Sequence, residues 1–490
     1  MILMIEGHDF HYEMENLCRI FFPYEKIKTV RERVEPEEIT AYTGVFERGD
    51  EVDLRVWLKI GDQRKEAEQT VAASQAHQDK ECERLLAVLL YGLFTDLCGY
   101  TPKWGILTGV RPIKLLRRLS EDMGLDNALD YFRNGLLVSE QKTEKSLRTM
   151  GNEQKILSLS RPESFSLYLS IPFCPTRCAY CSFVSQSVER AARLIPKYVE
   201  LLCGEVEKTA QVARDLGLRL ESVYVGGGTP TTLSAEQLSQ ICRTVTGNFD
   251  LSTCREFTVE AGRPDTITME KLAALKESGV TRISVNPQTL SDEVLREIGR
   301  RHTAAQTIEA FEMARRAGFG NINMDLIVGL PKDTVAGFEH TLEQILKLDP
   351  ESITIHALSL KRSSRITQTG GRFENDAETA GGMLDYGDRR LTESGYLPYY
   401  LYRQSRMVGN LENTGWSKPG FESLYNVYVM DETHTILACG AGAVSKVKEP
   451  GTDNLERIFN FKFPYEYVDR YPEMIERKDR VKEIYDEFWK

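Results

Sequence analysis

The sequence predicts an α/β fold built around an open, partial (β/α)6 barrel. From residue 165 onward, short β-rich segments alternate with amphipathic segments of helical period. The six strand candidates are Phe165–Ile171, Ser222–Val225, Glu256–Glu260, Arg282–Val285, Asn321–Val328 and Ser352–Ala357. Strands separated by helices of this length form βαβ units and a parallel sheet. A standard barrel of this kind closes with eight units, so six units predict a barrel that stays open.

Two further regions flank the predicted barrel. Residues 1–160 mix strand-like stretches such as 52–60 with helical ones such as 82–97, which predicts an N-terminal α+β domain without a motif that indicates its role. The polar stretch 150–163 is typical of a connection between domains. Residues 161–370 then form the barrel. Residues 371–490 are rich in Tyr, Gly and Asn, which favours a small C-terminal α+β cap over the substrate site.

The composition excludes some classes of protein. The chain has 490 residues with 62 basic and 73 acidic side chains, and its net charge is −11. This acidic excess argues against general binding to nucleic acid. No apolar run approaches the roughly 18 residues that a membrane helix needs, and the first ten residues lack the pattern of a signal peptide. We therefore expect a cytoplasmic protein with no membrane span and no nucleic-acid partner.

Three of the ten cysteines lie within eight residues, in Cys174-Pro-Thr-Arg-Cys178-Ala-Tyr-Cys181. In a large protein without an export signal, such a cluster indicates a metal site rather than disulfides. Three thiolates leave one iron of a [4Fe–4S] cubane without a protein ligand. The amino and carboxylate groups of S-adenosylmethionine (SAM) can chelate that iron, which predicts reductive cleavage of SAM to a 5′-deoxyadenosyl radical. A zinc site is the alternative, but such sites usually pair two Cys-x2-Cys knuckles, and this sequence has one.

A glycine-rich segment, Val225-Gly-Gly-Gly-Thr-Pro230, follows the second predicted strand. Glycines let the backbone approach a ligand closely and present N–H groups to an anion. Taken alone, the segment is equally typical of a tight turn after a strand. Because it accompanies the cysteine loop, we interpret Gly227, Gly228 and Thr229 as contacts of the amino-acid part of SAM.

Polar side chains also occur at the ends of the next three predicted strands. Glu260 ends the third strand, Gln288 follows the fourth, and Asp325 lies on the fifth. Barrel chemistry sits at the carboxyl ends of the strands, and these groups match the hydrogen-bonding needs of the ribose, amino group and adenine of SAM. Arg300 is the candidate partner of the SAM carboxylate, with Arg301 as the alternative. Each of these residues, taken singly, is also typical of a cap or a loop.

Together these motifs resemble the oxygen-independent coproporphyrinogen III oxidase family of the radical SAM superfamily. The resemblance covers about residues 165–333 and continues more weakly to about 446. The HemZ-type coproporphyrinogen dehydrogenase branch is the most similar. The segments that carry the resemblance are Tyr168-Leu-Ser-Ile-Pro-Phe-Cys174 with the cysteine loop, Gly226-Gly-Gly-Thr-Pro230, Arg282-Ile-Ser-Val-Asn-Pro-Gln288, Asn323-Met-Asp-Leu-Ile-Val-Gly-Leu-Pro331, Gly105-Ile-Leu-Thr-Gly-Val-Arg-Pro112 and Asn410-Leu-Glu-Asn-Thr-Gly-Trp-Ser-Lys-Pro419.

The resemblance implies a role for each matching residue. Cys174, Cys178 and Cys181 match the cluster ligands. The matching SAM contacts are Tyr168, Gly227, Gly228, Thr229, Glu260, Gln288, Arg300 and Asp325. Tyr180 precedes the third cysteine, and we expect it to pack over the cluster or SAM unless it is ordinary core. The implied reaction converts two propionates of coproporphyrinogen III to vinyl groups: the adenosyl radical removes a β-hydrogen, carbon dioxide leaves, and an electron passes to an acceptor.

Three positions depart from the well-characterised bacterial oxidases of this family. Phe183 stands where they have a fourth cysteine, Ser170 where they have His, and Asn286-Pro-Gln288 where they have Gly-Val-Gln. The first departure also occurs in a related branch that binds and transfers haem. That branch starts close to its cysteine loop, whereas some 165 residues precede the barrel here.

A substrate with four carboxylates needs cationic partners. Lys361, Arg362 and Arg365 follow the sixth predicted strand, and Arg403 and Lys418 are further candidates. Any one of them is also typical of a solvated loop. The sequence thus predicts a radical SAM coproporphyrinogen III dehydrogenase of anaerobic haem and porphyrin biosynthesis, reduced by a protein such as flavodoxin or ferredoxin. The alternatives are a haem-binding transfer protein of the same family, or a radical SAM enzyme for another tetrapyrrole or an unrelated substrate.

Overall fold

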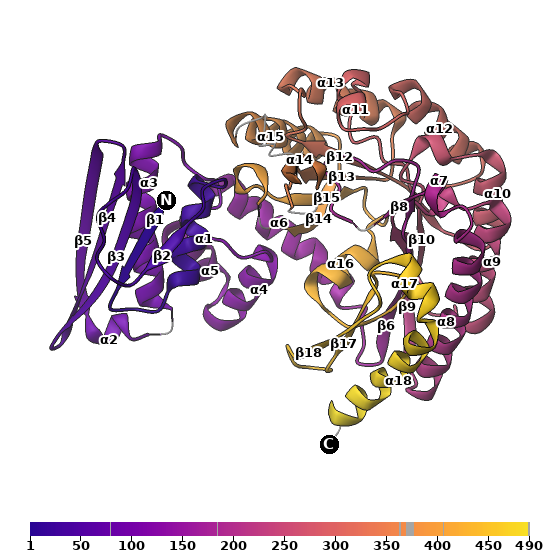
Figure 1. The fold of residues 1–490 in the computed structure, drawn as a ribbon, viewed down its shortest axis with the longest axis horizontal. Helices are drawn as coiled ribbons and strands as arrows, with labels where there is room; N and C mark the ends of the chain where they lie inside the picture. The colour runs from indigo at the N-terminus through magenta and orange to yellow at the C-terminus, as the bar shows by residue number, and fades with distance from the viewer. Residues whose placement is uncertain (79, 184, 362–363, 369–376, 405, 489–490) are drawn as a thin grey trace. The chain divides into compact units, whose positions relative to one another are not determined.

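The computed structural model describes residues 1–78, 80–183, 185–361, 364–368, 377–404 and 406–488 (Figure 1). The chain divides into two compact units. The first consists of residues 1–147 and 403–412, and the second of residues 148–402 and 413–490. The chain therefore does not divide into three units at the expected boundaries near residues 160 and 370. Of the C-terminal residues, 403–412 belong to the first unit and the others to the second.

The first unit contains a five-stranded mixed sheet in the order β2-β1-β3-β4-β5. Its strands are β1 Ile2–Glu6, β2 Lys28–Val30, β3 Ile39–Arg48, β4 Glu51–Ile60 and β5 Gln63–Ala72. In β4, alternate residues such as Val52 and Leu54 are fully buried, as expected for a strand with one face on a core. That core contains side chains of the helices α1 (His11–Phe21) and α3 (Glu81–Cys98). The strand expected at 52–60 and the helix expected at 82–97 are both present.

A buried ion cluster holds the loop 403–412 within this unit. The carboxylate of Glu412 is fully buried and accepts hydrogen bonds from Lys142 Nζ at 2.5 Å and Lys145 Nζ at 3.0 Å, both from helix α6 (Glu140–Leu157). The indole N–H of Trp104 donates to the same carboxylate at 2.7 Å. Burial would raise the pKa of Glu412, but the two ammonium groups outweigh it and lower the pKa well below its usual range.

Replacing Glu412 by Gln should destabilise the first unit by about 3–5 kcal/mol, because two buried ammonium groups would lose their counter-charge. Urea unfolding followed by tryptophan fluorescence measures the effect. The control is Asp96→Asn, which removes the exposed partner that lies 2.9 Å from Lys65 and should leave the transition unchanged. Equal stability of the two variants would show that the ion cluster does not hold this loop.

The second unit is built on one eleven-stranded sheet. Its centre consists of six parallel strands in the order β6-β9-β10-β11-β12-β13. They span Ser164–Ile171, Arg219–Gly227, Glu256–Glu260, Arg282–Ser284, Ile322–Val328 and Ser352–Ala357. Among the described strands, the order runs from β14 to β18 without returning on itself. All six predicted strands are present, and the prediction of an open (β/α)6 barrel is confirmed.

Helices connect the parallel strands and follow the outer side of the curved sheet (Figure 1). They are α8 Ile195–Asp215, α9 Ala235–Asn248, α10 Met269–Glu277, α11 Asp292–Glu297, α12 Ala304–Arg316 and α13 Val335–Leu348. Capping boxes at Ser234 and Thr303 fix where α9 and α12 begin. In the part of the chain that the structure describes, no helix has both the length and the apolar character needed to cross a bilayer.

The C-terminal residues extend the sheet at both ends instead of forming a separate cap. β14 (Leu397–Tyr402) and β15 (Asn413–Ser417) form antiparallel strands next to β13. β16 (Thr435–Cys439) pairs in parallel with β6 and continues into β17 (Val444–Lys448) and β18 (Leu455–Phe459). The expected α+β content is present, and its strands hydrogen-bond to the barrel strands, so this region extends the barrel sheet.

A buried carboxylate holds the segment after β16 in place. Glu205 on α8 is fully buried and accepts hydrogen bonds from Gly440 N, Asn460 Nδ2 and Tyr467 OH at 2.6–2.7 Å, with Lys478 Nζ at 2.6 Å. Next to it, the Tyr198 hydroxyl donates to Ser170 O and accepts from Ala441 N, both at 2.8 Å. These bonds connect the end of β6 to the C-terminal residues.

Candidate functional site

The three clustered cysteines lie in one loop that follows β6 and starts at β7 (Phe173–Cys174). Cys178 is buried, and Cys174 and Cys181 are half-buried. Thr229 Oγ1 donates to Cys174 Sγ at 3.5 Å, and the Arg263 guanidinium donates to Cys178 Sγ at 3.9 Å. Hydrogen bonds to sulfur are one means by which proteins tune an iron–sulfur cluster. The predicted ligands thus share a largely enclosed loop with donors directed at two of the three sulfur atoms.

Hydrogen bonds from two sides fix the shape of this cysteine loop, residues 174–181. Ala179 N donates to Ile298 O at 3.0 Å, and Thr176 Oγ1 donates to Gly299 O at 2.9 Å. Ile366 N, on the short helix α14 (Arg365–Gln368), donates to Ala179 O at 3.2 Å. The loop is therefore held both by the residues that follow α11 and by α14.

Burial governs the protonation of these thiols. It raises the pKa of Cys181 to about 11. It also raises the pKa of Cys174, although the hydrogen bond from Thr229 partly opposes this. Both groups are thiols near neutral pH in the metal-free chain, so iron binding must release their protons.

The glycine-rich loop after β9 interlocks with the cysteine loop. Gly228 N donates to Ile171 O at 2.8 Å, and Thr229 N donates to Phe173 O at 2.7 Å. A Cβ atom on Gly228 would lie 2.7 Å from each of these two carbonyl oxygens, which is too close for any side chain. Gly227 has a φ of +100°, a conformation that favours glycine. The segment is therefore more than a tight turn, because it joins the ends of β6 and β9.

Two half-buried carboxyl groups, Glu260 and Asp325, lie on β10 and β12, the strands on either side of β11. The Tyr224 hydroxyl donates to Glu260 Oε1 at 2.6 Å, and burial raises the pKa of Glu260 to about 7 despite that hydrogen bond. Asp325 accepts from Asn323 Nδ2 at 2.7 Å and lies 3.8 Å from His356 Nε2. Burial opposes ionisation of Asp325, but His356 and Asn323 together lower its pKa. The site thus combines a carboxyl group that titrates near neutrality with one that stays ionised.

Gln288 has an unusual backbone and a side chain that lacks a partner. Its φ is +68°, its N–H donates to Asp325 O at 2.9 Å, and its carbonyl accepts from Ile327 N at 3.0 Å. Its side-chain Oε1 is buried and has no hydrogen-bond partner among the residues that the structure describes. A buried acceptor left unsatisfied costs about 1–3 kcal/mol. A ligand that brings a donor to this atom would recover that cost.

The structure distinguishes the two candidate arginines. Arg300 is 7% exposed, and its guanidinium donates to Asn286 O at 2.6 Å, Gly262 O at 3.3 Å and Tyr180 OH at 3.4 Å. The side chain of Arg301 is 69% exposed. Arg300 is therefore the arginine that lies in the buried site, and its hydrogen bond to the Tyr180 hydroxyl places Tyr180 there as well.

Three tyrosine rings stack in the interior of the barrel. The Tyr224 and Tyr425 centroids are 4.5 Å apart at an interplanar angle of 20°, and Tyr168 and Tyr425 are 6.0 Å apart at 15°. Burial raises the pKa of all three phenols, which keeps them protonated. Tyr168, expected near SAM, thus lies in a wall of aromatic rings that also contacts Glu260 through Tyr224.

These residues fit a [4Fe–4S] cluster and SAM. One loop supplies three thiols, the glycine-rich loop leaves its backbone accessible, and Gln288 Oε1 lacks a donor. In the described ranges of the chain, no three His, Cys, Asp or Glu side chains are close enough to share a single metal ion. A cubane cluster does not require three ligands around one metal ion, because each thiolate binds a different iron.

Several residues of the site were not predicted from the sequence. Arg263 is 3% exposed, contacts Thr176 and Cys178, and pairs with Asp265 at 3.1 Å. In the sequence, the feature that could have identified Arg263 is its position shortly after the third predicted strand. Tyr425 lies on α16 (Leu424–Asp431), some 160 residues after Glu260, and no local pattern connects it with the barrel interior.

The cations expected to bind substrate are dispersed. Lys361 is half-buried after β13, and burial lowers its pKa. Arg362 lies outside the described residues. Arg365 begins α14 beside the cysteine loop. Lys418 pairs with Asp349 at 2.7 Å.

Arg403 belongs to the first unit. It is 3% exposed, and its guanidinium donates to the carbonyls of Leu107, Gly109 and Asn410 at 2.5–3.4 Å. This guanidinium stabilises the loop 403–412, which argues against the expected contact between Arg403 and a substrate.

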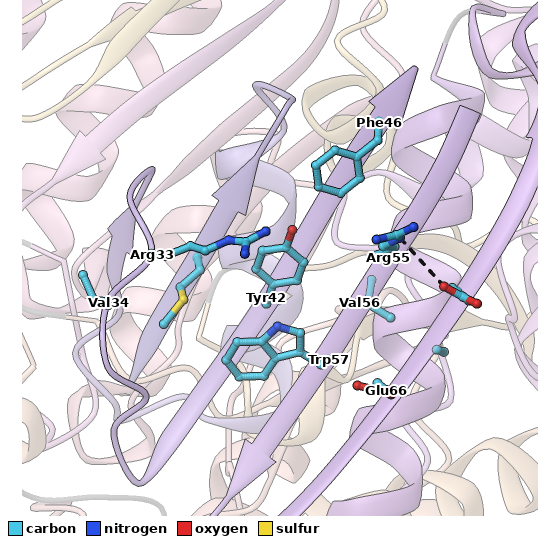
Figure 2. A pocket seen from close by; sticks show the side chains of 11 residues that line it. Arg33, Val34, Tyr42, Phe46, Arg55, Val56, Trp57 and Glu66 are labelled. Atoms are coloured by element: carbon cyan, nitrogen blue, oxygen red, sulfur yellow. Dashed lines mark ion pairs between the residues drawn. The ribbon is translucent and has the colours of Figure 1, made fainter. Parts of the chain in front are cut away.

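The first unit has a concavity of about 580 Å³ on the outer face of its sheet (Figure 2). Tyr42 and Trp57 stack there at 5.6 Å, and the Arg55 guanidinium lies 5.5 Å from the Phe46 centroid. Arg55 also pairs with Glu68 at 3.8 Å. Arg33 pairs with Glu6 at 3.0 Å and Glu66 with Arg64 at 3.6 Å, so each charged group of this concavity has a counter-charge beside it. The candidate chemistry lies in the second unit, with the cysteine loop.

Comparison with protein families matches the chain to the Radical SAM superfamily over residues 168–345. This match spans the cysteine loop, the glycine-rich loop and the strand ends with Glu260, Gln288 and Asp325, and it implies a [4Fe–4S] cluster and SAM as cofactors. The chain is 34% identical over 493 residues to the oxygen-independent coproporphyrinogen-III oxidase-like protein HemZ of Bacillus subtilis, covering 98% of this chain and 97% of that protein.

A second group of relatives is haem chaperones. The chain is 33% identical over 304 residues to the heme chaperone HemW of Bacillus subtilis, covering 60% of this chain and 74% of that protein. Among solved structures, coproporphyrinogen III oxidase HemN of Escherichia coli, a radical SAM enzyme, is similar with a TM-score of 0.52 at 22% identity, covering 66% of this chain and 72% of that one. At this identity the likeness establishes the fold.

Gly228→Ala should prevent retention of the cluster, because the new Cβ would push the ends of β6 and β9 apart. Iron and sulfide content after anaerobic reconstitution measures this, and the variant should hold well under half of the wild-type iron. The matched control is Gly247→Ala on α9, where a Cβ meets nothing within 4 Å. A full cluster in the Gly228 variant would show that this contact does not shape the cysteine loop.

Gln288→Ala should weaken SAM binding about five- to hundred-fold, the equivalent of one buried hydrogen bond. The free protein should lose no stability, because the deleted Oε1 has no partner within the described residues. Equilibrium dialysis with SAM and thermal unfolding of the SAM-free protein measure the two effects. Gln240→Ala, at an exposed position of α9, is the control. Unchanged SAM affinity would mean that Gln288 does not face the nucleotide.

Proposed function

Because this chain belongs to the radical SAM family of oxygen-independent coproporphyrinogen-III oxidase-like proteins, we propose that it oxidatively decarboxylates the propionates of coproporphyrinogen III without oxygen. The observation that carries the proposal is the match to the HemZ protein over almost the whole of both chains. That match includes the first unit, whereas the match to the haem chaperone covers 60% of this chain.

The cofactors of the proposed reaction would be held by residues already described. Cys174, Cys178 and Cys181 would bind the [4Fe–4S] cluster. The SAM site would consist of the glycine-rich loop with Tyr168, Tyr180, Glu260, Gln288, Arg300 and Asp325. When bound, the two cofactors supply a radical able to remove a hydrogen atom from an unactivated carbon.

The chain's own side chains would bind and shield these groups. Asp325 stays ionised and so can oppose the positive charges of SAM, while the buried Arg300 can oppose its carboxylate. Glu260, with a pKa of about 7, can hold or release a proton as the ligand requires. The stacked rings of Tyr168 and Tyr224 would line this region with apolar surface, and displacing water from a site protects a radical from side reactions.

Recognition of the substrate is the finer part of the proposal. Burial lowers the pKa of Lys361, so a propionate beside it would favour the charged ammonium and gain an ion pair. Arg362 and Arg365 follow within four residues. All ten cysteines are free thiols, which suits a reducing compartment, and we place the reaction in the cytoplasm.

A haem-binding transfer protein is the second candidate function. Two observations favour it: the 33% identity to a heme chaperone, and Phe183, which stands where the oxidases of the family carry a fourth cysteine. Phe183 is 63% exposed. In such a protein the barrel would bind haem, and cleavage of SAM would be slow or absent.

Anaerobic incubation of the cluster-loaded protein with SAM, a reductant and coproporphyrinogen III should release carbon dioxide and form 5′-deoxyadenosine. Mass spectrometry should detect a product whose mass is lower than that of the substrate by one or two formic acid equivalents. The triple change of Cys174, Cys178 and Cys181 to Ala should abolish both products. Lys361→Ala should raise the substrate KM several-fold and leave substrate-free 5′-deoxyadenosine formation intact, with the exposed Lys347→Ala as control.

Other results of this experiment would redirect the proposal. Tight haem binding without decarboxylation, under every reductant, would move the protein to the transfer class. Rapid SAM cleavage with neither haem binding nor decarboxylation would preserve the radical chemistry and discard the tetrapyrrole.

A further inference from the structure

A cleft of about 470 Å³ lined mainly by arginines lies against the cysteine loop. Five of its seven lining residues are arginines: Arg177, Arg296, Arg300, Arg301 and Arg365. They come from three separate segments, namely the cysteine loop, the end of α11 with the residues that follow it, and the start of α14. The convergence of these segments builds one strongly basic surface on a chain whose net charge is −11.

The positive charge of this arginine cleft faces solvent. Arg177, Arg296, Arg301 and Arg365 are exposed, whereas Arg300 is buried and directs its guanidinium to backbone carbonyls and Tyr180. Among the described residues, acidic side chains do little to compensate the charge of Arg301. Glu189 lies 3.9 Å from Arg301 with both side chains largely exposed, and Glu297 pairs with Lys332 at 2.9 Å.

The cysteine loop itself forms part of the cleft. Thr176 and Arg177 stand between Cys174 and Cys178, and Thr176 is hydrogen-bonded to Gly299, another lining residue. Electron tunnelling weakens steeply with distance, so a protein that reduces the cluster must dock where the cysteine loop reaches the surface. The arginine cleft is such a place, and its charge selects an acidic partner.

We propose that the arginine cleft is the docking surface for a small acidic electron-transfer protein that carries a flavin or an iron–sulfur centre. The proposal rests on the radical SAM part of the proposed function and requires no tetrapyrrole. The donor loses one electron, and this electron ultimately breaks the bond between sulfur and the 5′-carbon of SAM. Methionine and a 5′-deoxyadenosyl radical result, so each molecule of SAM that is cleaved requires one electron from one docked donor.

The composition of the surface favours a protein partner over the carboxylates of a small substrate. A substrate must reach the radical near Glu260 and Asp325, whereas the hydrogen bonds from Ala179 and Thr176 to residues 298–299 hold the cysteine loop across the inner side of the cleft. Arginine and aromatic residues are enriched at protein interfaces. The same loop region carries Phe183, an aromatic residue that is 63% exposed.

Binding of oxidised flavodoxin to the cluster-loaded chain, measured by calorimetry, tests the docking surface directly. The double variant Arg296→Glu/Arg301→Glu should weaken binding about ten- to hundred-fold at low salt and should remove most of its salt dependence. The matched control is Arg243→Glu/Arg316→Glu, which changes the net charge equally at exposed positions on α9 and α12. Oxidised ferredoxin forms a second arm, and the two arms identify which carrier is used.

Substrate-free formation of 5′-deoxyadenosine provides the functional readout. With reduced flavodoxin the rate of the Arg296/Arg301 variant should fall in parallel with its affinity, whereas with dithionite, which needs no docking, it should stay within two-fold of wild type. Equal losses with both reductants, or unchanged binding of both carriers, would overturn the proposal. A weaker affinity for coproporphyrinogen III with normal carrier binding would also overturn it and assign the cleft to the substrate. Failure to decarboxylate the tetrapyrrole affects none of these readouts.

Discussion

The candidate site depends on one close approach, between the backbone of Gly228 and the carbonyls that end β6 and begin the cysteine loop. Because no side chain separates them, the N–H groups of Gly228 and Thr229 can satisfy Ile171 O and Phe173 O at 2.7–2.8 Å. This contact brings the cysteine loop and the glycine-rich loop together. The register of the parallel sheet then sets Glu260 beside Ser284 and Asp325 beside Thr354, so each later strand delivers its polar group to the same edge.

The C-terminal residues complete this arrangement. β16 covers the free edge of β6, and the buried Glu205 fixes the segment that follows β16. A Cβ on Gly440 would lie 2.6 Å from Ser170 O, so the segment presses directly on the end of β6. An uncovered β6 would be an open sheet edge at the very strand that leads into the cysteine loop. These residues therefore support the site from outside the barrel, which explains why they do not form a unit of their own.

The sequence predicted what depends on local pattern. Strand and helix periodicity located all six barrel strands, and the motifs located the cysteines, the glycine-rich loop and the polar strand ends. Features that depend on distant segments were not predictable. In the sequence, Glu412 is typical of a loop residue, and only the fold places Lys142 and Lys145 beside its carboxylate. Arg403 likewise resembles a solvated cation in the sequence, but in the fold its guanidinium donates to three backbone carbonyls. Tyr425 joins Tyr168 and Tyr224 only through the fold. The left-handed backbone of Gln288 has no counterpart in local propensity, because the isolated pairing with Leu326 imposes it.

The two candidate functions make different demands on the same barrel. A carrier of haem needs a binding site but no repeated supply of electrons, whereas an enzyme that cleaves SAM consumes one electron for each molecule. Exposed arginines that converge on the cysteine loop from three segments carry a cost, since like charges repel when they are brought together. An enzyme to which an acidic donor must dock repeatedly gains from such a cluster of arginines. A haem carrier has no comparable use for it. The match over the full chain therefore supports the enzyme, and the arginine cleft would meet the repeated demand for electrons that such an enzyme has.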